Sequence, residues 1–300
     1  MISRFSRFYL PGRPASLYKA FLGSEQAFAV EGLMLAFEPK SGKHAVAELA
    51  IGIYYNSTLN GQAIEKAKAR RAEYKEFLPV ESPVAGFQVN MSSGAPNVSQ
   101  IIQEGFLWQR MKSDGTVGWQ ISVQEDRVVV NCLEYTNWDQ VWAKMSRWLL
   151  DMHQQIIAGG HTATAFSLQF IDQFSRKQPV TRHILRELFS TESKFLPRRF
   201  FENSELWHVH QGWFEEAPAP LKGKKLNVIN LGANRIGPHN TVTLDHLMRV
   251  NLAADSPPLL TTEIEGSALE TALGALHNEN KHTVSDILSP EAAKAIGLVD

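Results

Sequence analysis

The sequence predicts an α+β protein, in which an antiparallel β-sheet carries long amphipathic helices packed on one face. Short runs that alternate apolar and polar residues, typical of strands, occur in both halves of the chain. The Asp114-Gly115 pair joins two such runs as a tight hairpin. Longer segments at 138–156 and 268–288 repeat apolar residues every three or four positions, which is typical of helices that bury one side. Strands and helices in this order favour an α+β plan over a parallel sheet.

The chain divides into an extension and two halves. Residues 1–43 are interrupted by Pro11, Pro14, Gly23 and Pro39, so we interpret them as an N-terminal arm. Residues 44–176 form a first α+β half, and residues 177–300 a second one that echoes it loosely. We expect the two halves to share one sheet.

In the first half, residues 44–56 read as a well-buried strand. A helix follows, which Asn60 caps and Pro79 ends. Four strands come next, at residues 84–91, 105–113, 116–124 and 127–135.

The clearest helix begins after Thr136, which forms an approximate capping box with Asp139. Its apolar stripe consists of Trp138, Val141, Trp142, Met145, Trp148, Leu149, Met152 and Ile156. At helical spacing, such a stripe is typical of a core. The strand after it, residues 162–174, places Asp172 in line with Phe166, Leu168 and Phe170.

The second half begins with a short helix at 181–189 and a strand in "ELWHVHQGWFEE", residues 205–216. Strands at 225–233 and 241–253 follow. Ser267 and Glu270 form a capping box for the next helix. Ser289 caps the last one, with Pro290 at its first position.

Composition places the chain among ordinary soluble globular proteins. It has 300 residues, of which 44% are hydrophobic and 20% charged, and a formal net charge of -1. This charge gives no general attraction to nucleic acid or anionic membrane. The single cysteine, Cys132, excludes an internal disulfide, and its alternating run favours a small buried side chain. No apolar run approaches the length of a membrane span, so we expect a cytoplasmic protein.

Two groups of side chains are candidates for chemistry. His208 and His210 lie two positions apart in a predicted strand and therefore share a face, where they could hold a metal with a third ligand. Asp172 followed by Glu192 and Lys194 has the spacing of the Asp…Glu-x-Lys magnesium site of many nucleases. Glu192 and Lys194 fall in a predicted loop, whereas that chemistry needs them on a strand. We therefore expect His208 and His210 to be structural, and we predict no metal or other cofactor.

The arm pairs basic with aromatic residues and is a candidate partner-binding segment. These residues are Arg4, Phe5, Arg7, Phe8, Tyr9 and Arg13. Such a cluster can grip single-stranded nucleic acid, or it can dock on an acidic protein surface. The last fifty residues, 251–300, are acidic and offer a surface of the opposite charge.

Several segments, in order, resemble a sporadically distributed family of uncharacterised bacterial proteins. They include "HAVAELAIGIYY", the stretch from Gln120 to Trp148 with its Tyr-x-x-Trp turn into the helix, and "LETALGALHNENKHTVSDILS". The likeness covers residues 44–295. The chain departs from the family where an Arg-Tyr pair and an Asn are usual, since it has Gln169, Phe170 and Asp172 there. The resemblance implies no reaction, but its patchy distribution is typical of genes in mobile or defence-related loci.

The sequence thus favours a non-enzymatic protein that binds another protein. It would be an antitoxin, a chaperone-like factor or a subunit of a bacterial defence system, with a toxin or defence effector as partner and a homodimer as a further option. One alternative is a metal-dependent nuclease or other hydrolase that uses the Asp172 or His208 groups. Another is nucleic-acid binding through the basic arm.

Overall fold

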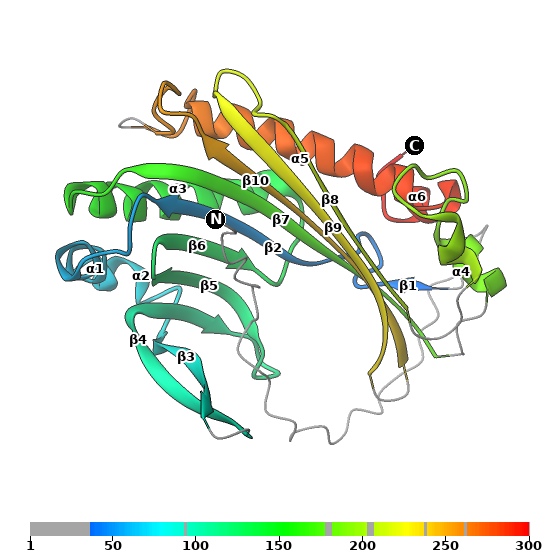
Figure 1. Ribbon diagram of the computed structural model, residues 1–300, viewed down its shortest axis with the longest axis horizontal. Helices are drawn as coiled ribbons and strands as arrows, with labels where there is room; N and C mark the ends of the chain where they lie inside the picture. The colour runs from blue at the N-terminus through cyan, green and yellow to red at the C-terminus, as the bar shows by residue number, and fades with distance from the viewer. Residues whose placement is uncertain are drawn as a thin grey trace.

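The computed structural model describes residues 37–92, 95–177, 182–202, 207–236, 239–260 and 263–299. In these ranges ten strands form one antiparallel sheet in the order β3-β4-β5-β6-β2-β7-β10-β9-β8, with β1 paired to β7 (Figure 1). The strands are β1 (Glu38–Pro39), β2 (Val46–Tyr55), β3 (Val80–Ser92), β4 (Ala95–Met111), β5 (Val117–Gln124), β6 (Arg127–Cys132), β7 (Ala163–Arg176), β8 (Trp207–Glu216), β9 (Gly223–Ile236) and β10 (His239–Leu252).

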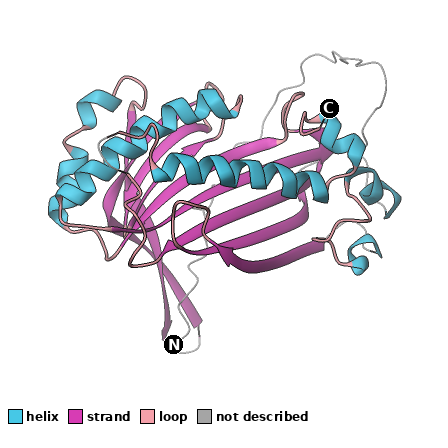
Figure 2. Cartoon of the chain, turned by 90° about the horizontal axis from the view of Figure 1, so that it is seen from above, coloured by secondary structure: helices cyan, strands magenta, loops and turns pink. Residues whose placement is uncertain are grey.

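Six α-helices accompany the sheet in the described residues, so the predicted α+β class is confirmed. They are α1 (Gly61–Lys68), α2 (Arg71–Tyr74), α3 (Trp138–Ala158), α4 (Arg182–Leu188), α5 (Ala268–Ile287) and α6 (Pro290–Ala295). A 3₁₀ turn, η1, covers Arg198–Glu202. Figure 2 shows α3 and α5 lying across the same face of the sheet.

The apolar face of the sheet is buried beneath these helices. On β2, Leu49, Ile51 and Ile53 point to the helices and have no exposed surface. They join a first core with residues of α1, α3 and the N-terminal half of α5. A second core lies beneath α4, α6 and the C-terminal end of α5. Helix α5 therefore packs on both cores: Leu273 lies in the first and Val284 in the second.

The helix caps were mostly predictable. The side chain of Asn60 accepts the backbone N–H of Ala63 at 2.8 Å, and Ser267 and Ser289 cap α5 and α6 in the same way. The predicted cap of α3 was wrong by one residue. Asn137 makes that bond, to the N–H of Gln140 at 3.0 Å, whereas the hydroxyl of Thr136 contacts the side chain of Gln140.

Two elements differ from the sequence prediction. Strand β4 begins ten residues before the predicted start, at Ala95, because that polar stretch pairs with β3 over most of its length. Backbone pairing stabilises such a strand even where the apolar alternation is weak. The single helix predicted after Asn60 is interrupted at Ala69, and the chain resumes as the short α2.

Part of the segment assigned to the arm belongs to the fold. Phe37 is 2% exposed and lies in the second core, beneath the guanidinium of Arg176. β1 pairs with the end of β7. The portion of the arm from 37 to 43 is thus packed on the sheet, while residues 1–36 lie outside the described residues.

Two glycines give opposite stability predictions. A Cβ at Gly159, where α3 ends, would lie 2.5 Å from the Cβ of Ala63 in α1, so the helices would have to separate. We expect Gly159→Ala to lower the free energy of unfolding by about 1–3 kcal/mol, as overpacking does. Thermal and urea denaturation measure this directly.

Gly274 is the matched control. It lies within α5, and a Cβ there would meet no atom within 4 Å. Gly274→Ala should raise the free energy of unfolding by roughly 0.5–1 kcal/mol, because alanine favours the helix. Equal effects of the two substitutions would contradict the close contact of α1 with the end of α3.

Candidate functional site

The segment that carries His208 and His210 is strand β8, as predicted. Both side chains are exposed on the face of the sheet away from α3 and α5, with ring centroids 6.4 Å apart. His210 Nδ1 is hydrogen-bonded to the Oδ1 of Asn230, an amide on the neighbouring strand. Among the described residues, no three His, Cys, Asp or Glu side chains gather closely enough to hold a metal ion.

The nuclease-like residues lie in different environments. Asp172 is 4% exposed on the helix-covered side of β7, and burial raises the pKa of its carboxyl to about 7. Glu192 and Lys194 are exposed in the loop after α4. This loop is held to α5, since Ser193 Oγ donates to Asp286 Oδ1 at 2.7 Å. In the described part of the chain no hydrogen bond or ion pair joins Asp172 to either residue.

The other residues singled out from the sequence are the single cysteine and the basic and aromatic residues of the arm. Cys132 is fully buried on β6, and burial raises the pKa of its thiol to about 12, which keeps it protonated. The proposed arm residues lie outside the described residues; they are Arg4, Phe5, Arg7, Phe8, Tyr9 and Arg13.

The second face of the sheet is the most extensive candidate surface. We call it the open face, because in the described structure no helix lies over it (Figure 1). The sheet curves so that this face is its inner side (Figure 1). Since side chains alternate along a strand, every residue between two core residues points to this face. Small side chains occupy its centre, at Ala50, Gly52, Ala165 and Ser167.

A row of polar side chains crosses the open face from β4 to β8. Strand register aligns them: Gln109 opposes Gln120, Gln120 opposes Asn131, and Asn230 opposes both Asp245 and His210. We call this set the central polar row: Gln109, Gln120, Asn131, Gln169, Asp245, Asn230 and His210. Ala50 on β2 lies between Asn131 and Gln169, so the row consists of two polar segments, one on each side of the small residues.

Hydrogen bonds link neighbours within the row. Gln109 Nε2 donates to Gln120 Oε1 at 2.7 Å, on the first-half side. Asp245 accepts from Gln169 Nε2 at 2.7 Å and from Asn230 Nδ2 at 3.2 Å. Asn131 Nδ2 donates outside the row, to Glu48 Oε1 at 2.7 Å. Together these bonds fix the direction of each amide, which makes the row a preorganised set of donors and acceptors.

Asp245 is the acidic residue of the row, and two amides of the row, Gln169 and Asn230, donate to its carboxylate. Burial raises the pKa of its carboxyl above the ordinary value, while the hydrogen bonds from Gln169 and Asn230 act in the opposite direction. Both amides point their N–H groups at this carboxylate, and their oxygens are left for other partners. One of these oxygens, on Asn230, is bonded to His210.

Basic groups on the open face have partners within the fold. Arg127 pairs with Glu125, and Lys224 with Glu216. The guanidinium of Arg249 lies 4.0 Å from the ring centroid of Tyr54. These charges are distributed around the row rather than gathered into a basic stripe. The arrangement suits hydrogen bonding to a polar ligand better than neutralisation of a phosphate backbone.

Sequence reasoning identified His208 and His210 on this face but missed the rest of the row. Each missed amide is an ordinary polar residue in an alternating strand, and only the register brings them into line. The available signal was the polar residue between two apolar ones, as in "WQISV" and "VVNCL".

Comparison with models of known protein families found no match to the chain, and comparison with curated proteins found none either. In the described residues no helix is long and apolar enough to cross a membrane.

The buried carboxyl of Asp172 predicts a pH dependence of stability. Its folded-state pKa of about 7 exceeds the ordinary value near 4, so between these pH values the unfolded chain releases a proton that the folded protein keeps. Stability is therefore lost as pH rises through this window, by up to about 1.4 kcal/mol per pH unit for this one group. Asp172→Asn, which stays neutral, should gain stability relative to the parent from pH 4 to 7 and level off above.

Urea denaturation at several pH values measures this difference. Asp114→Asn is the control, because Thr116 holds the pKa of the exposed Asp114 carboxyl below its ordinary value. That variant should show no such trend between pH 4 and 7. A difference between Asp172→Asn and the parent that does not change with pH would contradict the burial of an uncharged carboxyl.

Proposed function

We propose that this chain is a non-enzymatic recognition protein that binds another protein across its open face. The observation that carries this proposal is the central polar row, a line of oriented amides on a sheet face that no described helix covers. Amides offer donors and acceptors to peptide groups and polar side chains alike. A curved sheet face of this kind presents them on rigid strands, which lowers the ordering cost of binding.

The charge pattern favours a protein over a nucleic acid. Nucleic-acid affinity depends chiefly on Lys and Arg that neutralise phosphates. On the open face Arg127 and Lys224 already have acidic partners, and Asp245 adds negative charge at the centre. The hydrolase alternative has less support, since Asp172 and Glu192 lie on different elements with no contact between them in the described residues.

We further propose that the chain consists of two related halves, 44–176 and 177–300, with long amphipathic helices on one face. In support, the strands of the first half occupy one side of the sheet, in the order β3-β4-β5-β6-β2-β7, and those of the second half occupy the other side, in the order β10-β9-β8. Each half contains one long helix, α3 in the first and α5 in the second. A partner would then meet two similar surfaces that join where β7 pairs with β10.

For the partner we propose a bacterial toxin or defence effector, with this chain as its antitoxin, chaperone-like factor or complex subunit in the cytoplasm. The basis is the resemblance to a patchily distributed bacterial family. A second copy of the chain is the other partner that we consider.

Site-specific photocrosslinking tests the open face. A photoreactive phenylalanine analogue at Phe214, which is 64% exposed on the open face, should crosslink the partner in extracts of the native host. The same analogue at Ile157, 42% exposed on the helix side, should not. Both positions are exposed, so neither substitution should disturb folding.

Affinity measurement with the captured partner completes this test. Gln169→Ala and Asn230→Ala should each weaken binding about 10-fold, the effect of one lost hydrogen bond at an interface. Lys281→Ala, an exposed residue of α5, is the control and should bind as the parent does. Crosslinks from Ile157 alone, or unchanged affinity of the row variants, would refute the open face as the binding surface.

The arm yields a separate prediction. Arg and Tyr are enriched among binding hot spots, and the arm residues Arg4, Arg7, Tyr9 and Arg13 combine them. Deleting residues 1–14 should leave a soluble, folded protein with weaker assembly. Light-scattering mass and partner pull-down, compared with the full chain, measure this. Unchanged assembly would show that the arm is not part of the interface, and insolubility of the truncated chain would show that the arm is part of the core.

A further inference from the structure

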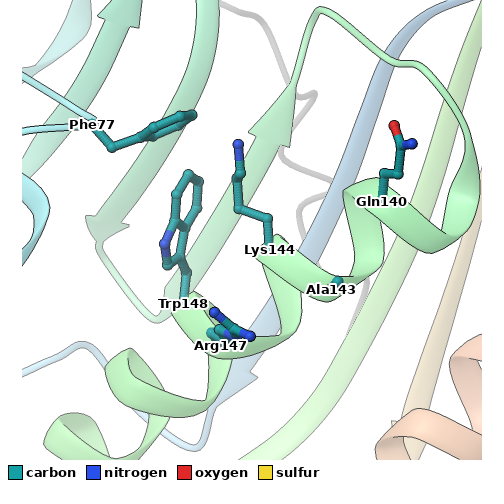
Figure 3. A pocket seen from close by; sticks show the side chains of 6 residues that line it. All are labelled: Phe77, Gln140, Ala143, Lys144, Arg147 and Trp148. Atoms are coloured by element: carbon teal, nitrogen blue, oxygen red, sulfur yellow. The ribbon is translucent and has the colours of Figure 1, made fainter.

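A hollow on the helix side of the molecule has no role in the fold or in the open face. It has a volume of about 370 Å³ and is lined by Phe77, Gln140, Ala143, Lys144, Arg147 and Trp148 (Figure 3). Five of these residues come from one side of α3, at helical spacing, and Phe77 comes from the turn after α2. The size suits a side chain or a short peptide segment.

The walls of the hollow are aromatic. The ring of Trp148 lies 5.3 Å from that of Phe77 and 5.4 Å from that of Trp119, measured between centroids. Trp148 and Phe77 are only partly buried against the first core, so some of each ring is left uncovered. These rings offer a flat apolar surface beside polar groups.

The cation that lies against the aromatic walls of the hollow is Lys144. Its Nζ lies 3.9 Å from the centroid of Phe77 and 4.8 Å from that of Trp119, so two ring faces hold it in place. Within the described residues Lys144 has no ion pair with an acid. Burial and, to a lesser degree, the nearby Arg110 lower the pKa of Lys144.

The surrounding charged groups leave the hollow positive. Arg110, whose guanidinium lies 4.5 Å from the Phe77 centroid, is paired with Glu134. Arg147 points from the next turn of α3 and is exposed. Asp151, one turn further, is already bound by Arg70 and Tyr74. Two cations, Lys144 and Arg147, thus face the hollow without an acid to neutralise them in the described structure.

We propose that this hollow binds an acidic peptide segment of a partner protein, with a carboxylate at Lys144 and Arg147 and an aromatic side chain on Phe77 and Trp148. A carboxylate supplies the negative charge that would neutralise the two cations, and an aromatic ring would stack on the aromatic walls of the hollow. The site does not depend on the open face, because it lies on the opposite side of the sheet.

Fluorescence anisotropy with a labelled peptide, Asp-Glu-Phe-Glu-Asp, tests the proposal on the full chain. We expect saturable binding that weakens with added salt. Lys144→Gln and Arg147→Gln should each weaken binding 5-fold or more. Lys281→Gln is the matched control, because it removes the same charge from an exposed position on α5 and should leave affinity unchanged.

Further peptides distinguish the possible ligands. A peptide with alanine in place of phenylalanine should bind more weakly, and one with lysine in place of the acids should not bind. Melting temperatures identify any variant that is unfolded, and Arg147→Gln, which changes an exposed side chain, keeps the test valid if Lys144→Gln is unstable. Equal weakening by Lys281→Gln would overturn the proposal, and so would displacement of the peptide by millimolar inorganic phosphate, which would make this a general anion site.

Discussion

Burial of one apolar face of a continuous sheet beneath α3 and α5 is the interaction on which the other features depend. Leu49, Ile51 and Ile53 on β2 and Phe166 and Leu168 on β7 have no exposed surface, and they belong to one core. Because strand side chains alternate, burial of these residues directs Ala50 and Gln169 to the opposite face. Helices over that face would have to bury the amides of the central polar row, at a cost for each group left unpaired. The one-sided packing and the polar open face are therefore two consequences of the same alternation.

The position of α5 along the sheet is set by a polar contact between the two cores. His246, fully buried on β10, is hydrogen-bonded through Nδ1 to Asn280 Oδ1 of α5 at 2.9 Å. Burial lowers the pKa of His246 to about 4, so the imidazole is neutral near pH 7. A shift of α5 by one turn would leave both groups buried without this bond, which costs roughly 1–3 kcal/mol per group. The apolar contacts of α5 favour burial in general, and this pair selects one register.

The sequence was informative wherever the structure depends on local periodicity. Strand β8 (Trp207–Glu216), the caps at Asn60, Ser267 and Ser289, and the long helix α3 all follow from side chains within a few residues of one another. It was uninformative where distant strands meet. The start of β4 is defined by its pairing with β3. The polar row requires the order of eight strands, and single-strand patterns do not contain that order.

The tryptophans of α3 show the same limit within one helix. Their spacing predicted a single core stripe, yet they contact two separate groups of residues. Trp138 stacks on His277 of α5 at 4.2 Å and on Trp142, so this side of α3 joins the two long helices. Trp148, further along the helix, faces Phe77 and Trp119 instead. A helix that lies across the middle of a sheet has different neighbours along its two flanks. On the flank away from α5, the short α1 and α2 are the described helices that contact α3. The aromatic hollow with its unneutralised Lys144 lies on this flank.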